Sequence, residues 1–423
     1  MRPEHEAIIS DERYIHARAL AAGLRHPLLA SESLLMASWS HPRAAGPFLT
    51  LLGSSRGYHF GNAASPWHHR LMMRKKTVVV VGAGASAEVG LPIGKDLRGQ
   101  IAGLLDIHFR DDGALQRGDR CIVEAFRVQA ARDPSLRRNI NPFIHAARAL
   151  RDALPQAMSI DNLLDTHSLD EHMQVCGKLG ICRAILNAER QSALFADRRN
   201  DPVRKLDFSN VDGTWFAAFF RLLTQGCRID DLDDRLQSIT FVVFNYDRCI
   251  EHFFCNGIQN YYNVNEATAV KALANLNVIH PYGSVGALPW QQPSDSMEFG
   301  AEPMASDLVR LFGGIRTFTE STKPDSEVTE QIHMRLAEAR LVLFLGFAYH
   351  SLNLKLLRLE PRGEWGPFAD CYGTAVGLST PDTSVLSQEL ASLSGLCLDR
   401  IVLRNDLKCA DLFSEYWRTL ELR

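Results

Sequence analysis

Short apolar runs alternate with helical patterns over most of the chain. Residues 77–81 form a continuous run of Thr and Val, which is typical of a strand buried on both faces of a parallel sheet. Helical patterns at 330–339 and 383–393 accompany the later runs. Strands that alternate with helices predict βαβ units, and therefore an α/β fold with a Rossmann-like parallel sheet and helices on both faces. The other predicted strands are 240–244, 277–280, 341–345 and 374–377.

A long helical stretch divides the predicted sheet in two. The longest candidate helix is 160–191, where Ser159 is a suitable N-cap, and a shorter apolar helix is expected at 215–224. We therefore expect a large helical insertion within a nucleotide-binding domain. The expected divisions are an N-terminal arm at 1–74, the nucleotide-binding domain at 75–105 and 236–385, the helical insertion at 106–235, and a C-terminal segment at 386–423.

Residues 1–74 are weakly patterned compared with the rest of the chain. They contain seven of the fifteen histidines and many Gly, Ser and Pro breakers. Short helices fit the pattern at 12–24 and 31–38. Because Met72 and Met73 directly precede the first strong strand, one hypothesis is that translation starts there. The alternative is a genuine N-terminal arm.

The composition is that of a globular protein. Hydrophobic residues make up 46% and charged residues 22% of the 423 residues, which excludes a disordered or fibrous chain. The formal net charge of −3 supplies no global positive field for nucleic-acid binding. The longest strongly apolar run, residues 341–349, is far shorter than the roughly 20 residues that span a bilayer, and no secretory signal is evident. We therefore expect a cytoplasmic protein with no membrane contact and no direct nucleic-acid binding.

The nine cysteines are irregularly spaced, and none belongs to a Cys-x-x-Cys pair. An odd number without that spacing argues against a disulfide framework and against a zinc ribbon. The expected state is reduced thiols packed as small apolar groups, with no bound metal.

The turn after the first predicted strand is rich in glycine. Gly82, Ala83, Gly84 and Ser86 follow the strand and precede a helical pattern. Glycines let a backbone approach a pyrophosphate closely, and a helix N-terminus offers N–H groups to it. The next glycine is Gly90, so the spacing differs from the standard dinucleotide fingerprint. The turn predicts phosphate contacts, and a glycine-rich turn that binds nothing is the alternative.

Polar residues follow two more of the predicted strands. Asn245 and Asp247 come directly after the strand at 240–244, where open α/β sheets bind ligands. An amide both donates and accepts hydrogen bonds, so Asn245 suits a ribose hydroxyl or an ordered water, and Asp247 is placed to orient it. His280 ends the strand at 277–280 and titrates near neutral pH, as a general base does. Taken alone, the first motif also fits a simple turn, and the histidine also fits a structural role.

The order of these motifs resembles that of the sirtuin superfamily, and in particular the bacterial sirtuin-like domains of antiphage defence. That family has a Gly-Ala-Gly-x-Ser turn with a later Gly-x-Pro, an Asn-Tyr-Asp turn, a histidine strand that leads into Gly-Ser, and a Leu-Gly-Phe turn. The resemblance spans residues 75–380, and 159–164 are also similar to a segment common in the defence branch. The matching residues are Gly82, Ala83, Gly84, Ser86, Gly90, Pro92, Asn245, Asp247, His280, Gly283, Ser284, Gly346 and Phe347.

Two departures separate the chain from the protein-deacylating sirtuins. Those enzymes carry a four-cysteine zinc ribbon and a Pro-Asp-Phe-Arg cofactor loop, whereas here the Cys pairs are missing and Pro92 is followed by Ile93 and Gly94. The resemblance therefore favours the non-zinc branch, which destroys the dinucleotide. Deacylases also place the histidine immediately before the glycine, where this chain has Tyr282. His280 lies two residues before Tyr282, and residues two apart in an extended segment share a face.

The resemblance implies an NAD glycohydrolase that releases nicotinamide and ADP-ribose, or a cyclised form, as the toxic effector of an antiphage system. The alternatives are an NAD-dependent protein deacylase or ADP-ribosyltransferase, and a non-catalytic nucleotide-sensing module. The choice between NAD and NADP stays open. In this interpretation Asn245, His280 and Asp247 carry the catalysis with His280 as general base, and NAD is contacted by Gly82, Ala83, Gly84, Ser86, Gly283, Ser284, Gly346 and Phe347.

An unrestrained NADase would kill its own cell, so its activity must be gated. The segments outside the predicted domain, at 1–74 and 386–423, carry too little pattern for a sensor domain. The resemblance therefore implies control by other chains: a homo-oligomer with low activity alone, activated by a partner such as a ring-shaped DNA-translocating ATPase or a short argonaute. The alternative is a constitutively active enzyme.

Overall fold

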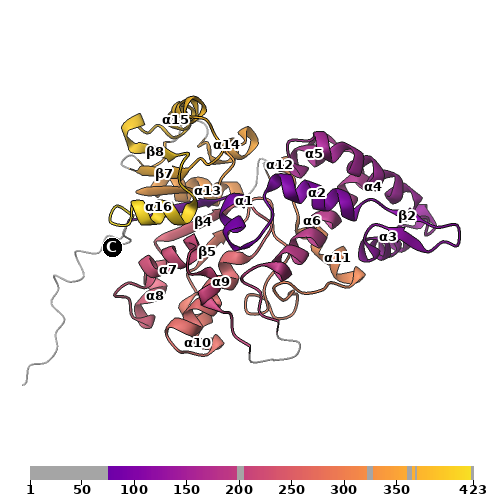
Figure 1. The fold of residues 1–423 in the computed structure, drawn as a ribbon, viewed down its shortest axis with the longest axis horizontal. Helices are drawn as coiled ribbons and strands as arrows, with labels where there is room; N and C mark the ends of the chain where they lie inside the picture. Colours follow the sequence, from indigo (N-terminus) through magenta and orange to yellow (C-terminus); the bar gives the residue numbers. More distant parts are fainter. Residues whose placement is uncertain (1–74, 198–203, 322–326, 360–363, 367–368, 421–423) are drawn as a thin grey trace, which may run out of the picture. The chain divides into compact units, whose positions relative to one another are not determined.

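A six-stranded parallel sheet carries the fold. The computed structural model describes residues 75–197, 204–321, 327–359, 364–366 and 369–420. Across the sheet the strands run in the order β5-β4-β1-β6-β7-β8, and every pairing is parallel (Figure 1). When the six strands of this sheet are numbered 1 to 6 in the order of the sequence, their order across the sheet is 3-2-1-4-5-6. This order confirms the predicted Rossmann-like α/β fold. The strands are β1 (Thr77–Val81), β4 (Ile239–Val243), β5 (Asn277–Ile279), β6 (Leu341–Leu345), β7 (Asp370–Thr374) and β8 (Ile401–Arg404).

The three central strands β4, β1 and β6 are buried along their whole length. Val79 of β1 stands opposite Phe241 on one side and Leu343 on the other. Because successive side chains of a strand point to opposite faces, Val78 and Val80 enter one hydrophobic core while Val79 and Val81 enter a second. This two-sided burial explains why β1 reads as an uninterrupted β-branched run.

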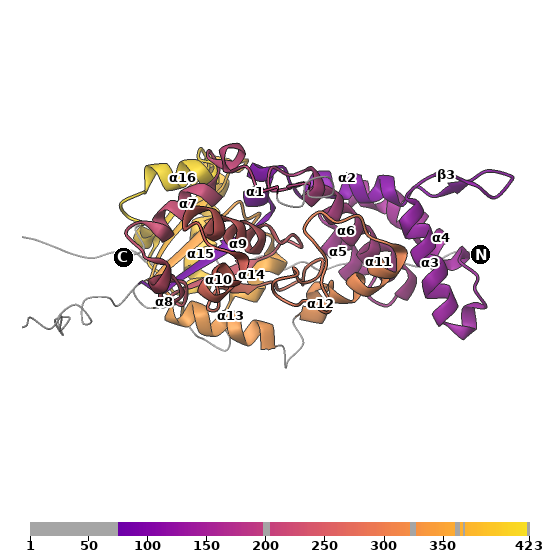
Figure 2. The same cartoon turned by 90° about the horizontal axis from the view of Figure 1, so that it is seen from below.

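Helices cover both faces of the sheet. Trp215 and Phe219 of α7 pack in the same core as Val79, and Phe219 makes edge-to-face contacts with Phe241 and Phe413. In Figure 2 the indigo strand β1 lies among strands of later colour, with helices on either side. The helices that pack with Val79 are α7 (Trp215–Thr224), α8 (Leu232–Leu236), α9 (Cys249–Tyr261), α10 (Glu266–Ala272) and α16 (Cys409–Glu415), and those that pack with Val78 include α13 (Glu327–Glu338), α14 (Ser351–Leu357) and α15 (Thr380–Ser394).

A helical part lies beside the sheet and is built from two stretches of the chain. Its first stretch also holds a two-stranded antiparallel ribbon, β2 (His108–Phe109) and β3 (Leu115–Arg117). Helix α11 packs on α3 and α6, and α12 packs on α5, although both follow β5 in the sequence. The helical part is therefore not confined to residues 106–235. Its helices are α2 (Gly94–Leu104), α3 (Arg120–Arg132), α4 (Asn141–Ala153), α5 (Ile160–Thr166), α6 (Glu171–Gln191), α11 (Ala305–Leu311) and α12 (Phe318–Ser321).

A buried ion pair joins the helical part to the sheet. Arg248, directly before α9, donates to both carboxylate oxygens of Glu189 on α6, at 3.1 and 2.6 Å. The two side chains are 1% and 0% exposed. The N–H of Gly300 also donates to Glu189 at 3.0 Å, and Arg248 donates to the carbonyl of Glu298 at 3.2 Å. This network fixes α6 relative to the turn that follows β4.

Three details differ from the sequence expectations. The helix expected at 160–191 is two helices, because both Ser159 and Asp170 act as N-caps and accept from the N–H groups of Asn162 and Met173. Strand β7 starts at Asp370, four residues before the predicted 374.

The sixth strand, β8, lies within 386–423, where no strand was expected. Both late strands have partly exposed positions, so neither forms a continuous apolar run.

Several expectations concern residues 1–74. The helices at 12–24 and 31–38, the arm itself and the proposed start at Met72 or Met73 all lie outside the described residues. Of the helices that the structure describes, none is long and apolar enough to cross a membrane.

Candidate functional site

A cavity of about 590 Å³ opens at the carboxyl ends of the strands. It lies over the point between β1 and β6 where the strand order reverses, the position at which open α/β sheets bind their ligands. Four strand-end segments surround it: 82–84 after β1, 244–247 after β4, 346–348 after β6, and Thr374 with Val376 at β7. The other lining segments include 91–95, 158–159 with Asp161, and 408–409.

The glycines of the first turn allow two backbone segments to meet. Gly82 N donates to Leu345 O and Gly84 N donates to Gly346 O, both at 2.9 Å. A Cβ on Gly82 would lie 2.6 Å from the Gly346 oxygen, and one on Gly84 would lie 2.9 Å from Gly346 Cα. Gly346 itself has a φ of +55° and faces Ala85 N. The contact between the β1 turn (which opens α1, Ala83–Ser86) and the β6 turn thus requires glycine without any ligand.

Asn245 is held at the wall of the cavity by Ser86. The Asn245 Nδ2 group donates to Ser86 Oγ at 3.0 Å, and the two residues are 9% and 2% exposed. Ser86 stands behind Asn245 and does not line the cavity. The structure therefore brings Asn245 to the cavity with Gly82, Ala83, Gly84, Gly346 and Phe347, and gives Ser86 the position of a support.

The ring of His280 lies behind Asn245 and is engaged on both sides. Its Nδ1 lies 3.1 Å from the Asn245 carbonyl oxygen, and its Nε2 lies 3.0 Å from Glu251 Oε1. Burial disfavours the charged ring most strongly, but Glu251 and the Asn245 carbonyl together outweigh it and raise the pKa of His280 above its usual value. His280 does not line the cavity. This geometry supports a role in holding Asn245, while the general-base role stays a prediction.

The remaining residues of the predicted set fall into two groups. Asp247 lines the cavity, and its Oδ1 accepts from Cys249 N at 3.1 Å, at the start of α9. Gly283 has a φ of +74°, and a Cβ there would lie 1.8 Å from the Gly314 oxygen. Neither Gly283 nor Ser284 lines the cavity.

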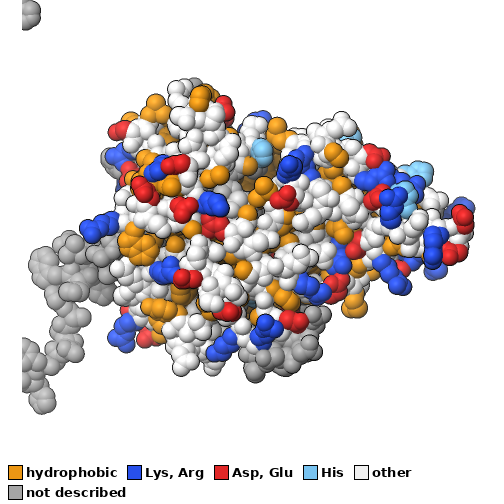
Figure 3. All heavy atoms as spheres, viewed as in Figure 1, with side chains coloured by type: hydrophobic (Ala, Val, Ile, Leu, Met, Phe, Trp, Pro, Cys, Tyr) orange, Lys and Arg blue, Asp and Glu red, His pale blue; other side chains and the backbone are white. Residues whose placement is uncertain are grey.

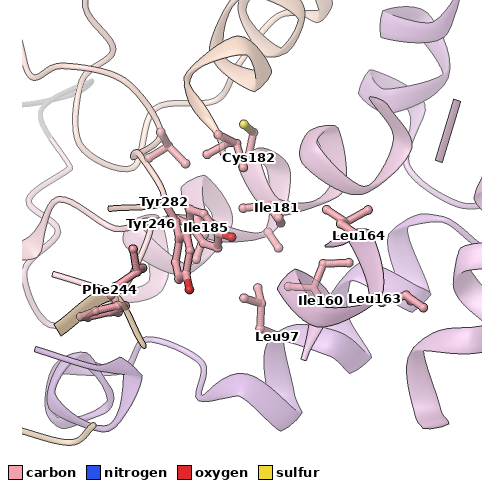
Figure 4. Close-up of a cluster of buried hydrophobic side chains, with 14 of the residues drawn as sticks. Leu97, Ile160, Leu163, Leu164, Ile181, Cys182, Ile185, Phe244, Tyr246 and Tyr282 are labelled. Atoms are coloured by element: carbon pink, nitrogen blue, oxygen red, sulfur yellow. The ribbon is translucent and has the colours of Figure 1, made fainter. Parts of the chain in front are cut away.

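Aromatic and aliphatic side chains form the floor between the cavity and the helical part. Phe244 packs against Phe347, with ring centroids 5.0 Å apart. Figure 4 shows Tyr246 and Tyr282 close to Ile185 of α6, between Phe244 and the side chains of α2 and α5. Tyr282 donates to Asn353 Oδ1 at 2.6 Å, and Asn353 lines the cavity. The floor therefore depends on both parts of the protein.

Sequence reasoning missed several charged residues on the cavity wall. Glu88 accepts from Trp215 N at 2.8 Å and Ala410 N at 3.0 Å, and burial raises its pKa. Asp161, near the start of α5, accepts a hydrogen bond from the Tyr246 hydroxyl. No motif spacing predicts either contact, because their partners lie far away in the sequence. Lys95, Lys408 and His350 also line the cavity.

The strand order and the position of the cavity define a Rossmann-type α/β protein. No protein-family model matches the chain, and no curated protein matches it. Among solved structures, one described as the crystal structure of a Sir2 homologue–NAD complex is similar over 82% of this chain and 90% of its own, with 14% identity and a TM-score of 0.34.

The surface carries charges of both signs. On the face in Figure 3, Lys and Arg side chains are interspersed with Asp and Glu. Within the described part of the chain, no group of three His, Cys, Asp or Glu side chains could hold a metal ion.

Proposed function

We propose that the protein is an NAD glycohydrolase. The observation that carries this proposal is the position of Asn245, which Ser86 and His280 hold at the wall of the cavity beside the Gly82–Gly84 turn. Rossmann-type sheets bind dinucleotides at this edge, and the cavity has the volume of an ordinary small-molecule site. The motif order shared with the sirtuin superfamily supports the same substrate.

In the proposed complex the dinucleotide lies along the carboxyl ends of the strands. The pyrophosphate lies over Gly82, Ala83 and Gly84, with Gly346 and Phe347 beside it, and the nicotinamide ribose lies next to Asn245. The adenosine end then extends toward β7 and the start of α16, where Lys408 lines the cavity.

Cleavage breaks the bond between ribose C1′ and the pyridinium nitrogen. The bonding electron pair goes to the nitrogen, so nicotinamide leaves as a neutral molecule and the ribose passes through an oxocarbenium-like state. A water oxygen attacks C1′ and gives up one proton, which leaves ADP-ribose. We assign Asn245 to the positioning of the sugar or the water, Asp247 to the turn that presents Asn245, and His280 to the support of the Asn245 backbone. The proton goes to solvent, because both ring nitrogens of His280 already lie against acceptor oxygens.

The experiment that tests this function is incubation of the purified protein with NAD in the absence of any peptide, followed by chromatography. Release of equal amounts of nicotinamide and ADP-ribose supports hydrolysis, and a cyclised product supports the cyclase form. Tight binding of NAD with no product, both alone and with co-expressed neighbouring gene products, would instead favour a nucleotide-sensing module.

A second candidate function is transfer of the ADP-ribosyl group, either to an acyl-lysine, as in a protein deacylase, or to another protein side chain, as in an ADP-ribosyltransferase. It is favoured by two exposed apolar side chains at the cavity, Ile93 and Met158, which are 42% and 68% exposed. Such side chains can pack against a peptide or an acyl chain. Nicotinamide release that depends on an added acyl-lysine peptide would select this candidate.

We also propose that assembly gates the activity, as expected of the toxic effector of an antiphage system. The protein alone is then a homo-oligomer of low activity, and a partner chain such as a ring-shaped ATPase or a short argonaute raises it. Light scattering after size-exclusion chromatography, with NAD consumption measured with and without co-expressed neighbouring gene products, tests this. A monomer that consumes NAD at full rate alone would contradict it.

A further inference from the structure

Three carboxylates of the described residues line the cavity, and two of them are committed to the backbone. The oxygens of Glu88 accept from the N–H groups of Trp215 and Ala410, and Asp247 accepts from the N–H of Cys249. These hydrogen bonds satisfy backbone N–H groups at the starts of α7, α16 and α9. Asp161 is the third carboxylate, and it accepts from the hydroxyls of Tyr246 and Ser159 as well as from its own backbone N–H.

The contact with Tyr246 links Asp161 to the turn after β4, and Asp161 and Asn245 line the same cavity. Asp161 is the second residue of α5, and Tyr246 is the immediate neighbour of Asn245, 85 positions further along the chain. The helical part thus presents a carboxylate to the turn that carries Asn245. Met158 and Ser159, which precede it, line the same cavity.

Asp161 has no salt-bridge partner among the described residues, although His350 lies near enough to lower its pKa. Within the described residues, no nitrogen of Lys, Arg or His lies within 4.0 Å of its carboxylate. Burial raises the pKa of Asp161, while the Tyr246 hydrogen bond and the nearby His350 act in the opposite direction. Because burial disfavours the charged carboxylate and no ion pair offsets this effect, a cationic ligand in the cavity would find a favourable partner in Asp161.

We propose that Asp161 supplies the counter-charge for the positively charged nicotinamide ring of NAD, and then for the positive charge on the ribose as the C1′–N bond breaks. This inference rests on the proposed function, because it uses the orientation with the nicotinamide ribose beside Asn245. Asp161 thereby selects the oxidised cofactor: NADH carries a neutral dihydronicotinamide ring and gains nothing from the carboxylate. Fixed charges aimed at developing charge also accelerate the bond cleavage itself.

The experiment compares equilibrium binding of three ligands by calorimetry: carba-NAD⁺, whose carbocyclic ribose prevents hydrolysis, NADH, and ADP-ribose. The wild-type protein should bind carba-NAD⁺ more tightly than NADH. The Asp161→Asn variant should lose roughly 10- to 100-fold in affinity for carba-NAD⁺, the effect expected of opposite charges about 4–6 Å apart, with NADH and ADP-ribose unchanged. Asp165→Asn is the matched control, since Asp165 lies on the same helix but accepts from Thr319 and does not line the cavity.

The outcomes separate this inference from the proposed function. If the wild-type protein leaves NAD intact but shows a carba-NAD⁺ preference that Asp161→Asn abolishes, the hydrolase proposal fails and the cation site stands. If the wild-type protein cleaves NAD and Asp161→Asn keeps both the preference and the rate, the inference fails and the hydrolase stands. Equal losses of affinity for all three ligands would show that Asp161 has a structural role only. The inference is also overturned if the wild-type protein does not prefer carba-NAD⁺ to NADH.

Discussion

The imidazole of His280 is held from both sides inside the protein, and Glu251 depends on it. One carboxylate oxygen of Glu251 pairs with His280, and the other is buried without a partner among the described residues. His280→Ala would leave a buried carboxylate uncompensated, so we expect a loss of about 3 kcal/mol in the free energy of unfolding, together with loss of NAD cleavage. Urea denaturation measures this, with His145→Ala on the exposed face of α4 as control. An unchanged unfolding free energy would contradict the pairing.

The same pair predicts a direction for the pH dependence of stability. The pKa of His280 is raised in the folded state, so its contribution is fully present below the unfolded pKa of about 6.5 and is lost as pH rises through the higher folded pKa. Glu251→Gln removes the main partner charge and should flatten this part of the profile. Denaturation of both proteins from about pH 6 to about pH 9 checks the sign. If the wild-type protein gained stability relative to Glu251→Gln as the pH rises, the predicted direction would be wrong.

For single residues, the sequence indicates which strand ends carry polar side chains, but not which way those side chains face. Asn245, Gly82 and Gly346 line the cavity, because they directly follow buried strands. His280 and Ser86 lie one layer further back. Asp161 was not predicted as a site residue, because its partner is 85 positions away and only tertiary packing brings them together.

The contact between the β1 and β6 turns is a property of two elements, and it explains the glycines better than a ligand does. Gly84→Ala would press a Cβ against the Gly346 backbone, so we expect a loss of roughly 1–3 kcal/mol in stability even without NAD. Gly99→Ala, in the middle of α2 with nothing within 4 Å, should instead stabilise by up to about 1 kcal/mol. Thermal or urea unfolding of both variants tests this. Equal effects of the two substitutions would mean that the turns do not touch.

Helices and strands whose boundaries are set by neighbouring residues can be predicted from the sequence. A strand at the edge of the sheet cannot be predicted in the same way. Helix α7 spans the predicted 215–224, and it could be predicted because neighbouring residues determine its apolar face and its boundaries. Strand β8 was missed because Ile401–Arg404 is mostly half-exposed and short. The break between α5 and α6 depends on Asp170 as a second cap within a continuous helical pattern.

For the molecule as a whole, the Glu189–Arg248 pair decides how firmly the helical part is joined to the sheet. Removing one partner leaves a buried charge, so Arg248→Met should cost about 3–5 kcal/mol. The double variant Arg248→Met with Glu189→Met should cost clearly less than the single one, because no lone charge remains. A double-mutant cycle in urea measures the coupling. Additive losses would indicate that the two side chains act independently.

The central claim is that the cavity over β1 and β6 cleaves NAD at Asn245. The most direct measurement is the amount of nicotinamide released from NAD by the wild-type protein, by Asn245→Ala, and by Asn260→Ala, an exposed asparagine on α9. The account predicts release by the wild-type protein and Asn260→Ala, and none by folded Asn245→Ala. Release by Asn245→Ala at the wild-type rate would contradict it.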